Sequence, residues 1–122
     1  MPNLRKAARD YCKPYEIFMI VDGDDELVGR MVLKLFNSIF QKDKVWFAYS
    51  NFISIRGNVG YSRPFPASVI KNNSFRRYPF VTSHLRAFYT QLFLNIKEED
   101  LKDQDGDYLQ AANDVAICLP IL

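Results

Sequence analysis

The sequence predicts one α/β domain spanning residues 1–122. Three patterns predict this class: a short apolar run typical of a strand covered on both faces, amphipathic helical patterns on either side of it, and an aromatic strand pattern farther along. Hydrophobic residues make up 48% of the 122 positions and aromatic residues 15%, which is enough to form a core and argues against a disordered chain.

Charge and cysteine content narrow the function classes. The formal net charge is only +2, which argues against a protein built mainly to neutralise a nucleic-acid backbone. We expect no transmembrane segment, because no run of 18 apolar residues is present, and no signal peptide, because the first twelve residues lack an apolar core. Cys12 and Cys118 are then expected to be reduced thiols of a cytoplasmic protein.

The first two expected elements are a helix and a strand. Residues 3–12 place apolar side chains at the i, i+3, i+4, i+7 spacing of an amphipathic helix, and Pro14 blocks its continuation. The run YEIFMIV at 15–21 ends in an acidic turn that contains Gly23. A short apolar run of this kind favours a strand buried on both faces.

A second helix and further strand follow. Residues 28–41 return to the helical period, with one wide apolar stripe. The stripe consists of Val28, Met31, Val32, Leu35, Phe36, Ile39 and Phe40. Residues 44–55 are rich in aromatic and β-branched side chains, which predicts one or two strands.

The second half of the chain predicts a loop and two helices. Glycines and prolines recur through 56–80, which indicates a loop with short irregular pieces. The apolar spacing at 83–96 predicts a helix with Ser83 as its N-cap. A charged connection over 97–110 leads to a short apolar helix at 113–122.

This element order supplies few strands. The buried strand at 15–21 requires neighbours on both sides, and the remaining residues provide them poorly. We therefore expect the chain to contribute to a larger sheet, and to self-associate through an exposed sheet edge or apolar surface.

The acidic turn after this strand is the first candidate site. Ligands of open α/β sheets bind beyond the carboxyl ends of strands, and Asp22 and Asp24 lie at such an end on either side of Gly23. Two such carboxylates can share a Mg²⁺ or Mn²⁺ ion whose shell is completed by substrate phosphates. The alternative is a solvated turn whose charges favour the start of the following helix.

A second acidic cluster gives a weaker indication. Asp103, Asp105 and Asp107 fall at the first, third and fifth positions of an EF-hand loop, but Tyr108 occupies the position that requires glycine. Calcium binding is therefore not expected here. Asp114 has two interpretations: a carboxylate that favours the start of a helix, or a general base on an element separate from the metal site.

Taken together, these motifs resemble the second half of a glycosyltransferase with the GT-A fold, of the family 2 type. Three stretches carry the resemblance: NLRKAARDYC with IFMIVDGDDEL, then VLKLFNSIFQKDKVWFAYSNFI, and then FRRYPFVTSHLRAFYTQLFLNI with DLKDQDGDYLQAANDVAICLPIL. The resemblance implies a partial, Rossmann-like GT-A sheet flanked by helices. The strands that bind the nucleotide in the N-terminal half of the family are missing, so the domain is fragment-like or reduced.

The resemblance also implies roles for individual residues. Asp24 would coordinate Mn²⁺ or Mg²⁺ directly, and Asp22 would bind the ribose or reach the metal through water. Asp114, with Asp107 as its substitute, would take the proton from an acceptor hydroxyl, so that sugar transfer from a nucleotide-sugar donor inverts the anomeric centre. Substrate-binding roles are implied by position for His84, Trp46, Arg76 and Arg77.

Each of these substrate-binding residues also has a structural interpretation. His84 would otherwise be a hydrogen-bonded residue in a first helical turn, and Trp46 a core residue of a strand. The arginines, Arg86 included, would otherwise form a solvated basic surface.

Three functions remain open from the sequence. The first is metal-dependent sugar transfer, incomplete in this chain alone, and the second is a non-catalytic glycan- or protein-binding module on the same scaffold. The third is Mg²⁺-dependent phosphotransfer, although neither a P-loop nor a kinase motif is present.

Overall fold

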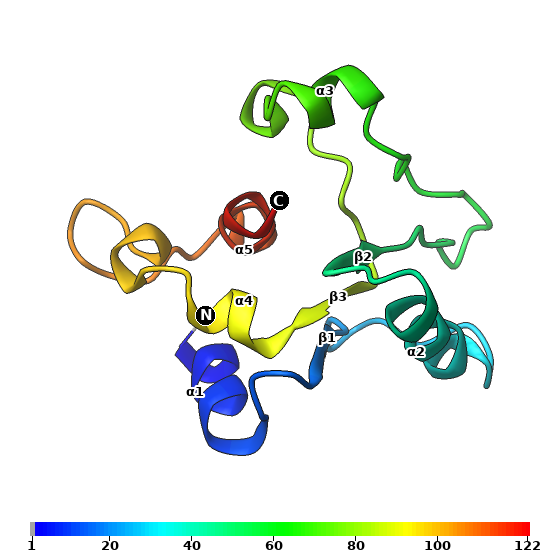
Figure 1. The fold of residues 1–122 in the computed structure, drawn as a ribbon, viewed down its shortest axis with the longest axis horizontal. Helices are drawn as coiled ribbons and strands as arrows, with labels where there is room; N and C mark the ends of the chain where they lie inside the picture. Colours follow the sequence, from blue (N-terminus) through cyan, green and yellow to red (C-terminus); the bar gives the residue numbers. More distant parts are fainter. Residues whose placement is uncertain (1) are drawn as a thin grey trace.

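A three-stranded antiparallel sheet lies at the centre of the computed structural model, which describes residues 2–122 (Figure 1). The strands β1 (Ile17–Ile20), β2 (Phe47–Tyr49) and β3 (Arg86–Tyr89) are arranged in the order β1-β3-β2. Because β1 and β2 both pair antiparallel with β3, they run parallel to each other. The predicted mixture of helices and sheet in an α/β chain is confirmed.

Residues 2–122 also form five helices and two 3₁₀ turns. They are α1 (Pro2–Tyr11), α2 (Val32–Lys42), α3 (Ala67–Lys71), η1 (Phe75–Arg77), α4 (Thr90–Leu94), η2 (Glu98–Leu101) and α5 (Asn113–Ile121), and α3 lies apart from the sheet (Figure 1). The helices expected at 3–12, 28–41 and 113–122 are therefore present. The second begins four residues later than predicted, after a turn in which Gly29 has a φ of 90°.

The helix predicted over 83–96 is wrong in its first half. Residues 86–89 form the central strand β3, and only residues 90–94 form the helix α4. Ser83 is therefore no N-cap, and it lies buried ahead of the strand. Because both faces of β3 are covered, its apolar residues do not alternate with polar ones. The apolar residues of β3 and α4 together then have the spacing of a single helix, which is why the sequence predicts one.

Helices cover both faces of the sheet. Phe36 and Phe40 of α2 pack on one face against Leu85 and Ala87. On the opposite face, the side chain of Phe88 packs with residues from α1, α4, η2 and α5. This second, larger cluster comprises Ala8, Ile20, Phe88, Phe93, Ile96, Leu101 and Ile117.

The strand β1 follows the same alternation. Ile17 and Met19 pack towards α2, and Phe18 and Ile20 pack towards the larger cluster. Both faces are therefore packed, but only Ile20 is buried and the other three residues are half-buried. In the described part of the chain β1 pairs with β3 alone, and it therefore forms one edge of the sheet.

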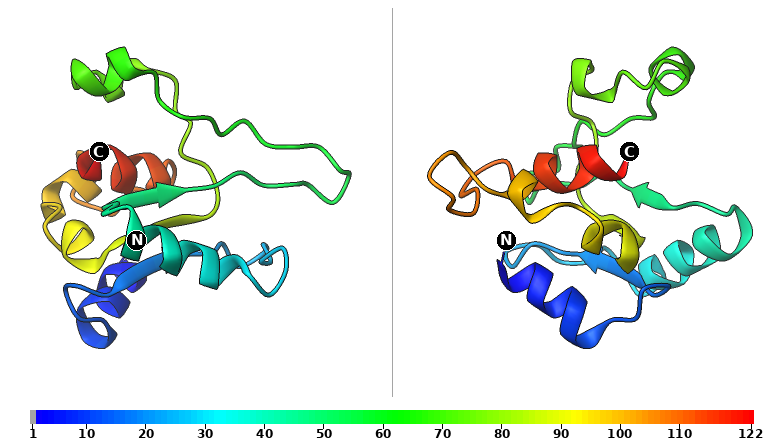
Figure 2. Two further views of the ribbon diagram at one scale, coloured as in Figure 1. Left: turned by 45° about the vertical axis from the view of Figure 1, so that its right-hand side comes forward. Right: turned by 60° about the vertical axis from the view of Figure 1, so that its left-hand side comes forward.

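A long loop projects from the end of β2. Residues 50–66 leave the sheet and return, and Figure 2 shows this excursion reaching far beyond the strands. A bridge between Ile53 and Val59 closes its tip, so the strand character expected over 44–55 is divided between β2 and this bridge. None of the described helices is both long enough and apolar enough to cross a membrane.

Candidate functional site

The pairing register of β1 and β3 creates the candidate site. Their last paired residues are Ile20 and Arg86, and continuing the antiparallel register by two residues places Asp22 opposite His84. Asp22 and His84 lie just beyond the paired strands, because β1 ends at Ile20 and β3 begins at Arg86. The site is therefore a direct extension of the sheet beyond its last ladder pair.

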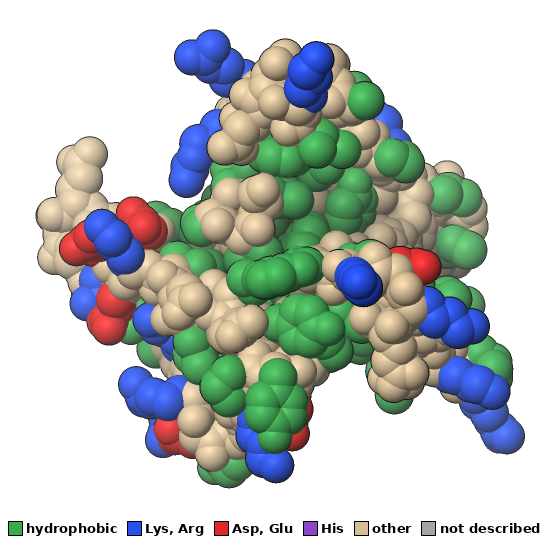
Figure 3. All heavy atoms as spheres, in the orientation of Figure 1, with side chains coloured by type: hydrophobic (Ala, Val, Ile, Leu, Met, Phe, Trp, Pro, Cys, Tyr) green, Lys and Arg blue, Asp and Glu red, His purple; other side chains and the backbone are tan. Residues whose placement is uncertain are grey.

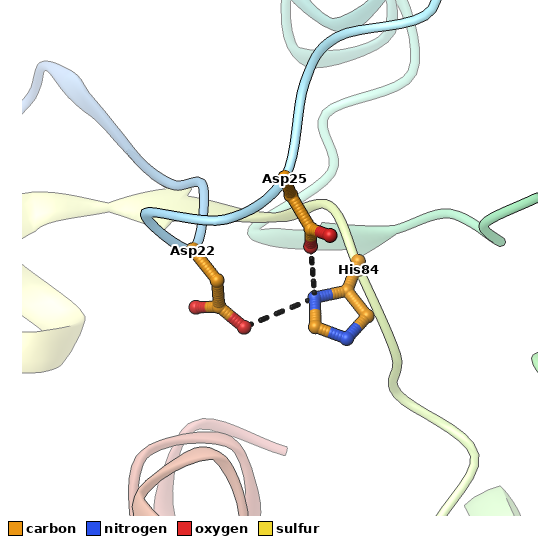
Figure 4. A group of neighbouring side chains, drawn as sticks. All are labelled: Asp22, Asp25 and His84. Atoms are coloured by element: carbon orange, nitrogen blue, oxygen red, sulfur yellow. Dashed lines mark ion pairs between the residues drawn. The ribbon is translucent and has the colours of Figure 1, made fainter. Parts of the chain in front are cut away.

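Three potential metal ligands converge at this point (Figure 4). His84 Nδ1 lies 3.2 Å from Asp22 Oδ2 and 3.1 Å from Asp25 Oδ2. The ligand atoms of the three side chains all lie within 4.8 Å of one another, and each side chain is 38–44% exposed. Within residues 2–122, no other group of three or more His, Cys, Asp or Glu side chains meets this criterion.

A buried arginine joins this cluster to helix α5. Arg86 Nη2 lies 3.5 Å from both carboxylate oxygens of Asp22, and its Nη1 lies 3.1 Å from Asp114 Oδ2. The Arg86 side chain is only 5% exposed. The carboxylates of Asp22 and Asp114, which come from opposite ends of the sequence, thus contact one guanidinium.

The charges at the site do not balance. Asp22, Asp25 and Asp114 supply three negative charges and Arg86 supplies one positive charge, which leaves −2 when the His84 imidazole is neutral. Like charges at such short range disfavour one another unless a cation lies between them. A divalent cation would neutralise this arrangement.

A neighbouring strand fixes the backbone of His84. Ser50, directly after β2, uses its Oγ to accept a hydrogen bond from the Leu85 N–H at 2.8 Å and to donate one to the His84 carbonyl at 3.0 Å. The Phe52 ring packs edge-on against the imidazole, with 5.5 Å between the ring centroids. The β2 side of the sheet therefore sets the position of the imidazole, and the β1 side supplies its carboxylate partners.

A cleft adjoins the cluster on the side of the acidic turn. Its volume is about 580 Å³, and it is lined by Ile20, Val21, Asp24, Asp25, Glu26, Leu27, Val28, Val32, Ser50, Asn51, Phe52, Ile53, Ser54, Ile55, His84 and Leu85. The acidic residues come from the turn after β1, and most of the apolar ones come from residues 27–32 and from the long loop. A ligand in this cleft would meet carboxylates and the imidazole on one side and an apolar wall elsewhere.

The structure regroups the acidic residues predicted for the site. Asp22 belongs to the cluster, but its partner there is Asp25, while Asp24 lies outside the cluster and lines the cleft. Asp114 lies in the first turn of α5 and reaches the cluster through Arg86. Asp107 is exposed in the turn after η2, where its backbone N–H donates to the carboxylate of Asp103.

The other predicted substrate-binding residues are dispersed. His84 lies in the cluster, ahead of a strand and not in a helical turn. Trp46 is 60% exposed, contacts Tyr89 edge-on and does not line the cleft beside His84. Arg76 and Arg77 belong to η1 and line a separate cleft with Leu119, Pro120 and Leu122.

Two members of the site were missed as such from the sequence. Asp25 belongs to the acidic turn after β1. The sequence prediction paired Asp22 with Asp24, two residues along the chain, and so selected Asp24 as the second ligand in place of Asp25. For Arg86 the sequence leaves phosphate contact or a solvated basic surface open, whereas the side chain is buried in the central strand. An arginine inside a run of aromatic and apolar residues was the available signal, because an arginine is almost never fully buried without a charged partner.

The donor set fits a divalent ion. Carboxylate oxygens suit Mg²⁺ and Mn²⁺, whereas imidazole suits transition metals such as Zn²⁺ and Fe²⁺, so this mixed donor set is compatible with several divalent ions. The proton and the metal would compete for His84 Nδ1, because the ligating imidazole must be neutral. Three protein ligands leave positions in an octahedral shell for water or substrate oxygens.

Comparison of the chain with protein-family models, curated proteins and solved structures found no significant match.

Proposed function

We propose that this chain provides the metal-binding and acceptor side of an enzyme that transfers a sugar from a nucleotide-sugar donor to an acceptor hydroxyl. The observation that carries the proposal is the convergence of Asp22, Asp25 and His84 Nδ1 beyond the end of β1. The sequence resemblance to GT-A glycosyltransferases of family 2 supports it, as does an acidic residue on a separate element, Asp114, within reach of the same arginine.

The proposed reaction has two roles for protein side chains, one in holding the metal and one in accepting a proton. Asp22, Asp25 and His84 would hold Mn²⁺, which when bound would stabilise the negative charge of the departing nucleoside diphosphate. Asp114 would accept the proton of the acceptor hydroxyl as its oxygen bonds to the anomeric carbon and the bond from that carbon to the diphosphate breaks. Attack from the face opposite the leaving group inverts the anomeric centre.

The single histidine provides a direct test of the metal site. Because His84 is the only histidine of the chain, ¹⁵N-histidine labelling gives ring signals that need no further assignment. We expect substoichiometric Mn²⁺ to broaden these signals, and uridine diphosphate to tighten Mn²⁺ binding. Asp22→Asn and Asp25→Asn should each weaken Mn²⁺ binding by about 10-fold or more.

Asp24→Asn is the matched control for this experiment. It removes an equal charge from the same turn but lies outside the cluster, so we expect a smaller loss of Mn²⁺ affinity than for Asp25→Asn. If Asp24→Asn lost as much Mn²⁺ affinity as Asp25→Asn, or more, Asp24 would be the metal ligand, as the resemblance implies. No broadening of the wild-type signals at millimolar Mn²⁺ would rule out the metal site and the proposed reaction with it.

A second candidate function, a non-catalytic binding module, is favoured by the exposed apolar side chains. Three apolar residues that line the cleft have largely exposed side chains. They are Val28 (75% exposed), Ile53 (61% exposed) and Ile55, which is fully exposed. Figure 3 shows further hydrophobic side chains across the centre of one face, with lysines and arginines mainly at its periphery. A module of this kind would bind a glycan or a protein partner with equal affinity in the presence of Mn²⁺ or EDTA, and Asp22→Asn would leave that affinity unchanged.

A further inference from the structure

We infer that Arg86 is a positioning residue that ties the candidate metal ligand Asp22 to the candidate base Asp114. Its effect on metal binding rests on the proposed function, but the tie itself concerns this chain's own side chains and can be measured without metal. Two carboxylates separated by 92 positions in the sequence meet at the two ends of one planar guanidinium.

The place of Arg86 in the fold makes this role possible. It occupies the first position of the central strand β3, on the face covered by the larger hydrophobic cluster, and it is paired with Ile20. From this position its guanidinium contacts Asp22, which follows β1, and Asp114 in the first turn of α5. An exposed arginine would adopt many conformations, whereas this one is confined by packing.

Burial makes the two carboxylates necessary. A guanidinium removed from water is costly unless it is paired and hydrogen-bonded, and Asp22 and Asp114 are its charged partners among the described residues. Arg86 Nε has no hydrogen-bond partner there, so the interactions of this group are concentrated at its two Nη atoms. Lysine carries the same charge at a single nitrogen, and therefore cannot reproduce a contact at each end of a planar group.

The tie acts on His84 through Asp22. Both oxygens of Asp22 lie 3.5 Å from Arg86 Nη2, and one of them also lies 3.2 Å from His84 Nδ1. Asp114 is held at its other oxygen too, because Oδ1 accepts a hydrogen bond from the Val115 N–H at 3.2 Å. Loss of the guanidinium fork should release Asp22 from the imidazole while leaving the Asp25 contact in place.

The first measurement is the ¹⁵N chemical shift of His84 Nδ1 in metal-free protein. We expect Arg86→Lys to change this shift, because the charge is kept but Asp22 is no longer oriented. Arg5→Lys is the matched control: Arg5 is a partly buried arginine that donates to the carbonyls of Ile96 and Leu94, and its replacement should leave the shift unchanged. A folded Arg86→Lys variant with the wild-type Nδ1 shift overturns the tie.

Asp114→Asn keeps the inference testable if Arg86→Lys does not fold. It alters a half-exposed side chain at the far end of the guanidinium, with no contact to His84 among the described residues. At about 0.5 M KCl, where the Debye length is only about 4 Å, a purely long-range charge effect on His84 is suppressed. A change in the Nδ1 shift that persists at this salt concentration supports the tie, and one that disappears overturns it.

Mn²⁺ affinity then separates this inference from the proposed function. If wild type binds Mn²⁺, Arg86→Lys should bind it about 10-fold more weakly, as is typical when a residue that orients a metal ligand is replaced. If Arg86→Lys binds Mn²⁺ like wild type, Arg86 has no positioning role. If wild type binds no Mn²⁺, the proposed function fails, and the chemical shifts alone decide whether Arg86 positions Asp22.

Discussion

At the residue scale, the imidazole of His84 connects the two halves of the candidate site. Its Nδ1 faces Asp22 and Asp25 from the β1 side, and its backbone is held by Ser50 from the β2 side. A serine hydroxyl that both accepts and donates a hydrogen bond within one peptide unit restricts that unit strongly. The position of the imidazole should therefore depend on a residue that touches neither carboxylate.

Ser50→Ala tests this dependence. The change removes the partner of the Leu85 N–H and of the His84 carbonyl, so we expect the free energy of unfolding to fall by about 1–3 kcal/mol and the His84 ring signals to shift. Urea unfolding and ¹⁵N-histidine spectra measure the two effects. Ser54→Ala is the control, because Ser54 Oγ accepts only from Asn58 in the exposed loop; equal effects of both variants would contradict a role for Ser50 in fixing His84.

Cys118 gives a prediction for thiol reactivity. Burial raises the pKa of its thiol from an ordinary value of 9.0 to about 11. At pH 8 only about one Cys118 thiol in a thousand is ionised, and the thiolate is the reactive form. Iodoacetamide should therefore label partly exposed Cys12 well before Cys118 in the folded protein, and both in 6 M guanidinium. Rapid native labelling of Cys118 would contradict this burial.

The same raised pKa predicts a loss of stability in alkali. Between pH 9 and pH 11 the unfolded chain loses the Cys118 proton while the folded chain keeps it. The folded state then binds more protons, so the free energy of unfolding falls as pH rises, by at most about 1.4 kcal/mol per pH unit. Cys118→Ala should lack this component, and Cys12→Ala should retain it, when urea unfolding is compared at pH 8, 9 and 10.

At the scale of elements, the outer helices were predictable and the central strand was not. The helical spacing of residues 3–12 and 28–41 corresponds to the helices α1 and α2. Only part of the second stripe is buried, because Phe36 and Phe40 are covered whereas Val28, Met31 and Leu35 are exposed. In β3 the side chains of Ala87 and Phe88 are both buried, one on each face of the sheet. Apolar and polar residues therefore do not alternate along this strand. Helical spacing over 85–96 was then the stronger pattern, although it describes two different elements.

This error limited how much of the site could be predicted. The position of Asp22 follows from a recognisable strand and turn, and it was foreseen. The partnership of Asp22 with His84 follows from the pairing of β1 with β3, which a helix over 83–96 excludes. The choice of Asp25 over Asp24 depends on the path of the turn, which a string of four acidic residues does not determine.

The start of α5 offers a test of local backbone conformation. Ala112 precedes this helix with φ 57° and ψ 29°, a left-handed conformation that favours glycine. We expect Ala112→Gly to raise the free energy of unfolding by about 0.5–1 kcal/mol. Ala111→Gly, at a neighbouring position without positive φ, should be neutral or destabilising. Chemical denaturation measures both, and destabilisation by Ala112→Gly would contradict the conformation.

At the scale of the whole molecule, the surface is large for the mass. The accessible area is 8730 Å² for a chain of 14.2 kDa, whereas a compact monomer of this mass exposes about 6,800 Å². Exposed apolar side chains are concentrated around α2 and the long loop, including Leu33 and Leu35 at 58% each. Surface of this kind is typical of an interaction site.

Self-association is the corresponding prediction. We expect sedimentation velocity to show oligomers that increase with protein concentration, because apolar side chains of α2 are left uncovered. Leu33→Lys with Leu35→Lys should shift the protein towards monomer and change the free energy of unfolding by no more than about 0.5 kcal/mol, as for surface positions. Phe36→Ala, on the buried side of the same helix, should instead cost about 3–5 kcal/mol. A wild-type monomer at all concentrations would contradict the prediction.

The shared register of β1 and β3 has one further consequence. A slip of a single residue between these strands would turn the apolar side chains of β1 to the opposite faces of the sheet and change the position of Asp22 relative to His84. Insertions and deletions in either strand should therefore be tolerated only in compensating pairs. The distance between Asp22 and His84 would then report the alignment of the two strands, even in a molecule whose core is filled.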